Sequence, residues 1–130
     1  MRQSGDEDEA EAMARGHWGH LREVLGHLAW SAADQIEWLG SVMLPDELAL
    51  DFDNVYGARW LSREAGWITD ELSGYLDEID RLTVDLTDEG PRPWNDEGLQ
   101  SHPTWERLRV LASRALDIMP PTPWTTRSDA

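Results

Sequence analysis

The stretch that decides the fold is residues 53–90, which read DNVYGARWLSREAGWITDELSGYLDEIDRLTVDLTDEG. Asp51 or Asp53 suits the N-cap of a helix, and Gly90-Pro91 suits its end. Between them apolar residues recur every three or four positions, which places them on one helix face. These residues are Ala58, Leu61, Ala65, Ile68, Leu72, Tyr75, Ile79, Leu82 and Leu86. We therefore predict one long helix here, with this stripe facing a core.

Two further helices are expected on either side of this stretch. A long one is predicted from about Ala14 to Met43, ended by Pro45, with a stripe of Trp18, Leu21, Leu25, Leu28, Ala32, Leu39 and Val42. A shorter one is predicted after Ser101, a suitable N-cap, with a face of Trp105, Leu108, Leu111, Ala112, Ala115, Leu116 and Met119. The predicted fold class is all-α, an antiparallel bundle of two long helices plus a shorter third helix.

The chain divides by composition into one domain and two terminal segments. Residues 1–12 are acidic and poor in large apolar groups, so we expect a disordered N-terminus. Residues 13–119 form the single helical-bundle domain. Residues 120–130, which begin with Pro120-Pro121-Thr122-Pro123, form a Pro-rich tail that carries Trp124. The unequal helix lengths leave part of the long apolar stripes uncovered, so that either the Trp94 loop and the tail, or a second copy of the chain, must cover them.

Charge limits the partners of this protein. The chain of 130 residues carries 26 acids and 11 arginines, no lysine, and a formal charge of −15. Such a surface repels nucleic acid and anionic lipid and attracts basic proteins. Residues 45–90 hold thirteen acids against three arginines. The most apolar window, residues 24–44, is too polar to span a membrane, there is no cysteine, and the acidic start leads us to expect no signal peptide. We expect a cytoplasmic protein, and the arginine-rich, lysine-free composition is typical of a GC-rich bacterial genome.

A second face of the predicted helix over residues 53–90 is organised for binding. Glu64, Glu71 and Glu78 repeat every seven residues, Asp70 lies on a neighbouring row, and Trp60 and Trp67 project between the rows. Exposed tryptophans with a charged rim resemble the anatomy of a protein-binding hot spot. We predict that these six residues bind a partner. The alternative is that the tail or the third helix buries both tryptophans and that the acids are simply solvated.

Small residues also repeat along the first predicted helix. Gly19, Gly26, Ala33 and Gly40 recur every seven residues and so share one side of a continuous helix. A glycine inside a helix costs roughly 1 kcal/mol relative to alanine, so that the repetition requires a reason. We predict that this row allows the close approach of another helix, within or between chains.

No motif for catalysis or metal binding is present. His20 and His27 lie roughly 10 Å apart along a helix, too far for one ion, and solvated or capping roles suit the histidines better. Asp34 with Glu37, and Asp77 with Asp80, are the acids that an all-α metal-dependent phosphohydrolase would use, but they point away from the apolar stripes. We expect no catalytic residue, no metal and no cofactor.

The sequence therefore favours a non-enzymatic acidic helical protein that binds a basic protein partner, in an inhibitor, immunity-type or adaptor role. The competing hypothesis is a structural homodimeric bundle without a ligand. We also expect a homodimer because a monomer of this size would expose the uncovered stripe. The phosphohydrolase is a weaker alternative.

Overall fold

Every regular element in the described part of the chain is helical, and residues 123–125 in the tail form a short 3-10 turn. The computed structural model describes residues 2–40 and 43–125. Within these ranges it has seven helices and no strand, which confirms the all-α prediction. The helices are α1 (Arg2–Ala29), α2 (Ala32–Leu39), α3 (Asp46–Gly57), α4 (Trp60–Glu64), α5 (Asp70–Asp88), α6 (Asp96–Ser101) and α7 (Pro103–Asp117). None of these helices is both long and apolar enough to cross a bilayer.

The prediction of one long helix over residues 53–90 is wrong, because this stretch is divided among α3, α4 and α5. Gly66 has a φ of 86°, a left-handed conformation that ends a helix and that glycine adopts without strain. Thr69 then caps α5, because its Oγ1 accepts a hydrogen bond from the backbone N–H of Leu72 at 3.1 Å. The stripe is confirmed only within α5, where Leu72, Ile79, Leu82 and Leu86 are buried, whereas Ala65 is exposed.

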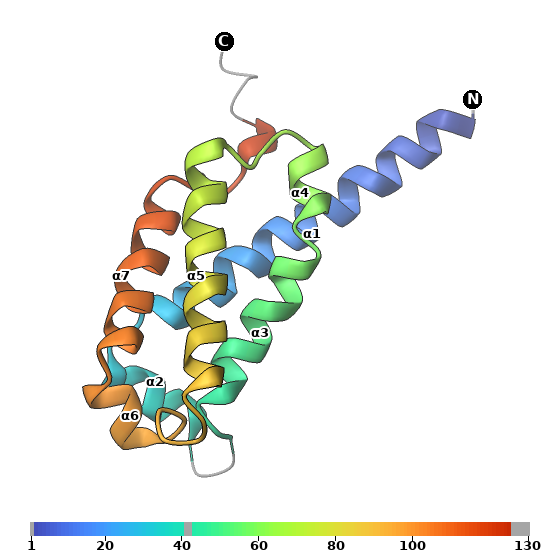
Figure 1. Cartoon of the computed structure of the whole chain (residues 1–130). Helices are drawn as coiled ribbons and strands as arrows, with labels where there is room; N and C mark the ends of the chain where they lie inside the picture. Colours follow the sequence, from blue (N-terminus) through green and yellow to red (C-terminus); the bar gives the residue numbers. More distant parts are fainter. Residues whose placement is uncertain (1, 41–42, 126–130) are drawn as a thin grey trace.

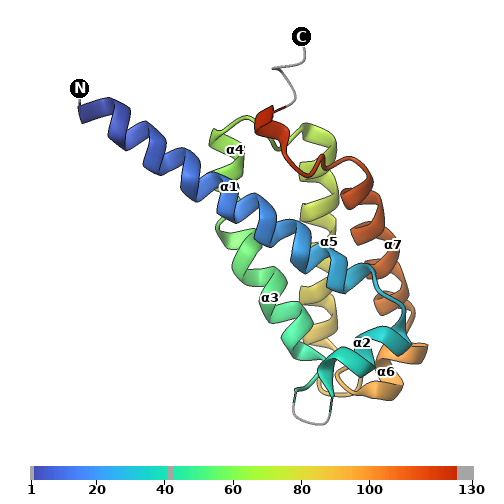
Figure 2. The ribbon, with the colours of Figure 1, turned by 180° about the vertical axis from the view of Figure 1, so that it is seen from behind.

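The long helix predicted over residues 14–43 is also divided. α1 ends at Ala29, and Ser31 caps α2 by accepting a hydrogen bond from the N–H of Asp34 at 3.1 Å. α1 begins at Arg2, in contrast to the disordered N-terminus expected for residues 1–12. Residues 8–13 are exposed, and this end of α1 projects away from the other helices (Figures 1 and 2). Val42, the last member of the predicted stripe, lies outside the described residues.

The third predicted helix corresponds to α7, with its apolar face largely buried. Its N-cap is His102 and not Ser101, which belongs to the preceding short helix α6. The Nδ1 atom of His102 accepts a hydrogen bond from the N–H of Thr104 at 3.1 Å. α6 itself was not predicted, because residues 96–101 lie before the expected start of the third helix, and His102 is the single residue that separates α6 from α7.

The four longest helices share one core. α5 and α7 lie side by side, α3 runs antiparallel to α5, and α1 crosses behind them (Figures 1 and 2). The largest fully buried side chains come from α1, α3, α5 and α7 and, for Leu99, from α6, and include Trp18, Leu25, Phe52, Leu72, Ile79, Leu99 and Trp105. The predicted arrangement was two long helices plus a shorter third helix. The observed arrangement is instead four helices that share one core.

The Trp94 loop and the tail cover the ends of this core. The indole of Trp105 donates to the carbonyl of Pro93 at 2.9 Å, and the indole of Trp18 donates to the carbonyl of Pro120 at 2.8 Å. Gly98 packs so closely on the loop that an added Cβ would lie 2.3 Å from the Pro93 carbonyl oxygen. The premise of the homodimer prediction, an apolar stripe left bare by unequal helices, is therefore wrong. The oligomeric state itself stays a prediction.

Candidate binding groove

Both tryptophans predicted to bind a partner, Trp60 and Trp67, line one groove. It has a volume of about 580 Å³ and is formed by α1, α4, the turn after α4 and the tail. Its lining includes Glu11, Ala14, Trp60, Glu64, Trp67 and Trp124. We call it the tryptophan groove. Three indoles and two carboxylates therefore line the groove. The sequence had indicated this combination of an apolar anchor and an acidic rim for Trp60, Trp67 and Glu64.

The three tryptophans differ in how firmly the fold holds them. Trp60 has 46% of its surface exposed, on the first turn of α4. Trp67 is half-buried, with its ring edge-on to the buried Trp18 at 6.0 Å and tilted against Trp124 at 5.2 Å between ring centroids. Trp67 therefore joins the core to the groove, whereas Trp60 stands free of the core. The alternative of burial by the tail applies to Trp67 in part and not to Trp60.

An arginine already lies against one wall of the tryptophan groove. The guanidinium carbon of Arg15 lies 5.1 Å from the ring centroid of Trp124, and the same side chain forms an ion pair with Glu11 one turn earlier on α1. A cation over an indole face is attracted by the negative charge of the ring face. The position of Arg15 shows that a guanidinium, an indole and a carboxylate fit together at this end of the groove.

The other predicted binding acids lie outside the tryptophan groove. Asp70 and Glu71 are exposed in the first turn of α5, where their charges favour the positive end of the helix. Glu78 lies further along α5, where hydrogen bonding to Arg81 lowers the pKa of its carboxyl. The seven-residue repeat of acids is therefore split between two helices. The structure brings together Trp60, Glu64 and Trp67, and the other three acids belong to the face of α5.

The glycine row does not form a helix contact within the chain. A Cβ added at Gly19, Gly26 or Gly40 would meet nothing within 4 Å, and Ala33 is exposed. The helix is interrupted between Gly26 and Ala33, so the four residues do not share one side. Gly40 has a φ of 64° and ends α2, which supplies its own reason for a glycine. The prediction of an intrachain contact is wrong, and a contact between chains stays untested.

Three of the histidines form hydrogen bonds or ring contacts within the fold. His17 is buried and bonded to Ser62 and Val55, in contrast to the solvated or capping role expected. The ring of His27 contacts both Trp30 and Trp38, at 4.6 and 4.5 Å between centroids, and these two rings lie 6.2 Å apart. His102 is a helix cap, as described above, and its Nε2 lies 2.8 Å from Glu89.

The two pairs of acids considered for phosphohydrolase chemistry do not converge on one site. Asp34 and Glu37 lie on α2 beside Trp30 and Trp38, whereas Asp77 and Asp80 lie on α5 facing α3. Asp77 accepts a hydrogen bond from the hydroxyl of Tyr56 on α3 at 2.7 Å. Burial and this bond raise the pKa of Tyr56 to about 12. Among the described side chains, those of residues 8–40 and 43–125, no group of three or more histidine or acidic residues is placed to hold a metal ion.

Three residues at the groove were not predicted from the sequence. Arg15 and Glu11 lie more than forty positions before Trp60, Glu11 in the segment expected to be disordered and Arg15 near the start of the first predicted helix. Trp124 was expected as a feature of the tail but not as part of the binding site. The one available signal was the spacing of Glu11 and Arg15, which is typical of an ion pair on a helix.

We compared the chain with models of protein families, with curated proteins and with solved structures, and found no match in any of the three comparisons.

Proposed function

We propose that this protein is a non-enzymatic binding protein whose tryptophan groove receives an arginine or lysine side chain of a basic protein partner. The observation that carries the proposal is the exposed ring of Trp60 in a groove with Glu64, Trp67 and Trp124. An aromatic ring binds a cation through its face, and a neighbouring carboxylate adds an ion pair. An inhibitor, an immunity-type protein or an adaptor in the cytoplasm would use such a surface.

The charge of the whole chain supports a basic partner. The formal charge of −15 attracts a cationic surface over distances longer than a contact and raises the rate of encounter. The same charge disfavours nucleic acid and anionic membranes, which carry negative charge themselves. Trp60 would then supply most of the binding energy, since a few large aromatic anchors dominate typical interfaces.

A homodimer is the competing prediction. The exposed Trp60 would suit self-association as an apolar anchor, but two chains of −15 repel each other at low salt. Sedimentation velocity at low and high salt separates the two predictions. A dimer that Trp60→Ala dissociates would favour self-association, and a monomer at both salt concentrations would favour a separate partner.

The proposal is tested by affinity capture with two baits, the wild-type protein and Trp60→Ala. Basic proteins retained by the wild type at low salt, lost at high salt and absent from Trp60→Ala are the expected result. Trp38→Ala is a matched control, because Trp38 is a partly exposed tryptophan outside the groove. The retained protein is then titrated by calorimetry, where we expect Trp60→Ala to cost about 2 kcal/mol or more. Equal retention by the wild type and Trp60→Ala would contradict the proposal.

A further inference from the structure

A second groove runs between α3, α5 and the loop that follows α5. It has a volume of about 620 Å³. Leu44, Leu50 and Val84 line it with 64%, 51% and 51% of their surfaces exposed, and the half-buried Trp94 lies at one end. Exposed aliphatic side chains that converge on one groove mark an interaction site more often than isolated ones do. We call it the α3–α5 groove after the two helices that supply most of its lining, which lie side by side (Figures 1 and 2).

The rim of the α3–α5 groove is acidic. Asp46, Asp53 and Asp80 line it, and no arginine or histidine is among its lining residues. Burial and the charge of the neighbouring Asp53 raise the pKa of the Asp80 carboxyl, although Arg59 acts in the opposite direction. Arg59 itself is held against Tyr56, with its guanidinium carbon 3.9 Å from the ring centroid. The groove therefore concentrates negative charge that a cation from outside would compensate.

We infer that the α3–α5 groove binds an amphipathic basic helix of a partner protein. Asp46 and Asp53 are seven residues apart on α3, so they lie roughly 10 Å, or two helical turns, apart. Leu50 lies between them on α3, and Val84 faces it from α5. The matching ligand is a helix with aliphatic side chains at positions i, i+3 or i+4 and i+7, flanked by arginine or lysine about two turns apart.

A helix fits this groove better than an extended peptide. The groove lies between two helices, whose backbone groups are already bonded within each helix, and the described residues contain no strand edge that would pair with a peptide backbone. An extended ligand would leave its own N–H and C=O groups without partners against Leu44, Leu50 and Val84, whereas a helix satisfies them internally. A second copy of this chain is disfavoured because its charge is also −15.

The test uses a synthetic capped helical peptide of about fourteen residues with leucines on one face and arginines two turns apart. Its control is a peptide of the same composition in an order that has no apolar face. Fluorescence anisotropy with the full chain should show at least about tenfold tighter binding of the patterned peptide. Equal affinities would mean that net charge alone attracts the peptides, and would overturn the inference.

Variants then locate the binding site on the protein. Val84→Ser should weaken binding of the patterned peptide about tenfold, because Val84 is an apolar anchor. Val110→Ser on α7 is the matched control, an exposed valine outside the groove, and should have no effect. Asp53→Asn should weaken binding and reduce its salt dependence, whereas Asp117→Asn should not. Circular dichroism melts check that each variant is folded, and an affinity that Val84→Ser leaves unchanged would contradict the inference.

The peptide experiment distinguishes binding in the α3–α5 groove from binding in the tryptophan groove. Trp60→Ala should leave the affinity for the patterned peptide unchanged, because Trp60 does not line the α3–α5 groove. A loss of peptide binding on Trp60→Ala, with Val84→Ser neutral, would place the peptide in the tryptophan groove and overturn this inference while supporting the proposed function. Sedimentation that shows a dimer dissociated by Val84→Ser would identify a second copy as the occupant and would also overturn it.

Discussion

The polar contacts of His17 define its tautomer, and its burial favours the neutral ring. Its Nε2 lies 2.8 Å from the carbonyl oxygen of Val55, which only accepts, so Nε2 carries the proton and donates. In the neutral ring Nδ1 then accepts a hydrogen bond from the hydroxyl of Ser62, at 2.7 Å. Burial lowers the pKa of His17, and the hydrogen bond to Val55 opposes this only in part. A neutral imidazole therefore joins α1 to α3 and α4.

We predict that His17 makes the protein less stable in mild acid. Because its pKa is lower in the folded than in the unfolded protein, the unfolded state binds more protons below about pH 6.5. The free energy of unfolding should fall as the pH drops below that value, by at most about 1.4 kcal/mol per pH unit, until the folded pKa is reached. Urea unfolding between about pH 8 and pH 5 measures this.

His17→Phe and His20→Gln provide the comparison. His17→Phe should cost about 1–3 kcal/mol at neutral pH, because Ser62 and the Val55 carbonyl lose their partner, and should remove the histidine contribution to the pH slope. His20 is exposed three residues further along α1, so His20→Gln should retain most of the slope. An unchanged slope in His17→Phe would show that another group causes the acid sensitivity.

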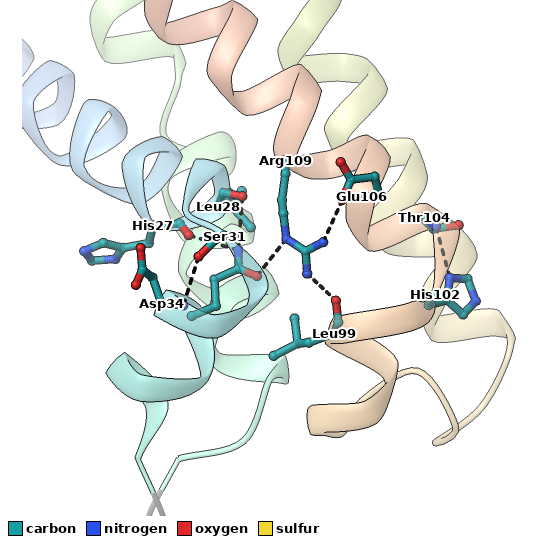
Figure 3. A network of polar contacts seen from close by, with 10 residues as sticks. His27, Leu28, Ser31, Asp34, Leu99, His102, Thr104, Glu106 and Arg109 are labelled. Carbon is teal, nitrogen blue, oxygen red and sulfur yellow. Dashed lines mark hydrogen bonds and ion pairs between the residues drawn. The ribbon is translucent and has the colours of Figure 1, made fainter.

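A buried arginine network explains the corner between α1 and α2. Arg109 on α7 donates to the side-chain oxygen of Gln35 at 3.1 Å, to Glu106 at 3.2 Å and to the carbonyl of Leu99 (Figure 3). The amide of Gln35 in turn donates to the carbonyls of His27 and Leu28 at 3.0 and 3.1 Å. Those carbonyls lie in the last turn of α1, where the helix has no i+4 N–H donor for them, although the N–H of Trp30 also donates to the His27 carbonyl at 3.4 Å. The network therefore satisfies the end of α1 from α2 and α7.

Arg109→Met should consequently destabilise the fold by about 2–4 kcal/mol, because Gln35 and the Leu99 carbonyl are left buried without a donor. Arg114→Met on the same helix is the control, since Arg114 is exposed and near the end of α7. Chemical denaturation of both variants measures the difference. A loss below about 0.5 kcal/mol in Arg109→Met would show that the network has little weight in stability.

At the scale of the element, two glycines around α4 and α5 should respond to alanine with opposite signs. Gly66 has a φ of 86°, where a Cβ strains the backbone even with open space around it, so Gly66→Ala should cost about 1–2 kcal/mol. Gly74 lies exposed inside α5 with nothing within 4 Å of an added Cβ, so Gly74→Ala should stabilise by about 0.5–1 kcal/mol. Thermal unfolding compares them. Stabilisation by Gly66→Ala would contradict the break between α4 and α5.

The elements were predictable where periodicity and burial agree. The apolar faces of α5 and α7 are buried as their spacing indicated. The breaks at residues 30–31, 58–59 and 65–69 were not predictable from spacing, because apolar residues continue in helical register through all three. Their signals were local, Ser31 and Thr69 as caps and Gly66 as a left-handed residue, and each of these types also occurs inside helices.

The candidate site was predictable only within one segment. Trp60, Glu64 and Trp67 are close in sequence, so a helical spacing was enough to group them. Their neighbours Glu11, Arg15 and Trp124 come from the two ends of the chain, and their proximity depends on how α1 and the tail pack. The α3–α5 groove likewise depends on the packing of two helices that had been predicted as one.

For the whole molecule, the dominant electrostatic feature is the formal charge of −15, which opposes compaction. We predict that raising sodium chloride from about 0.05 to about 0.5 M increases the melting temperature by a few degrees, because salt screens the repulsion between carboxylates. Calorimetry measures the shift. Chloride is preferred because sulfate strengthens apolar burial by itself. A melting temperature that falls with salt would mean that ion pairs such as Arg81 with Glu78 outweigh the repulsion.

Recognition of a cationic side chain by the tryptophan groove can be measured directly by a titration that follows the indole N–H signals of the ¹⁵N-labelled protein. The two probes are N-acetyl-arginine amide and its neutral counterpart N-acetyl-citrulline amide, and Trp60→Phe assigns the Trp60 signal. We predict that the arginine probe shifts the Trp60 signal in a saturable way and leaves the signal of the buried Trp105 unchanged. The shift of the Trp60 signal should be smaller in Glu64→Gln than in the control Glu97→Gln. A Trp60 signal that arginine does not move, or that citrulline moves equally, would contradict the account.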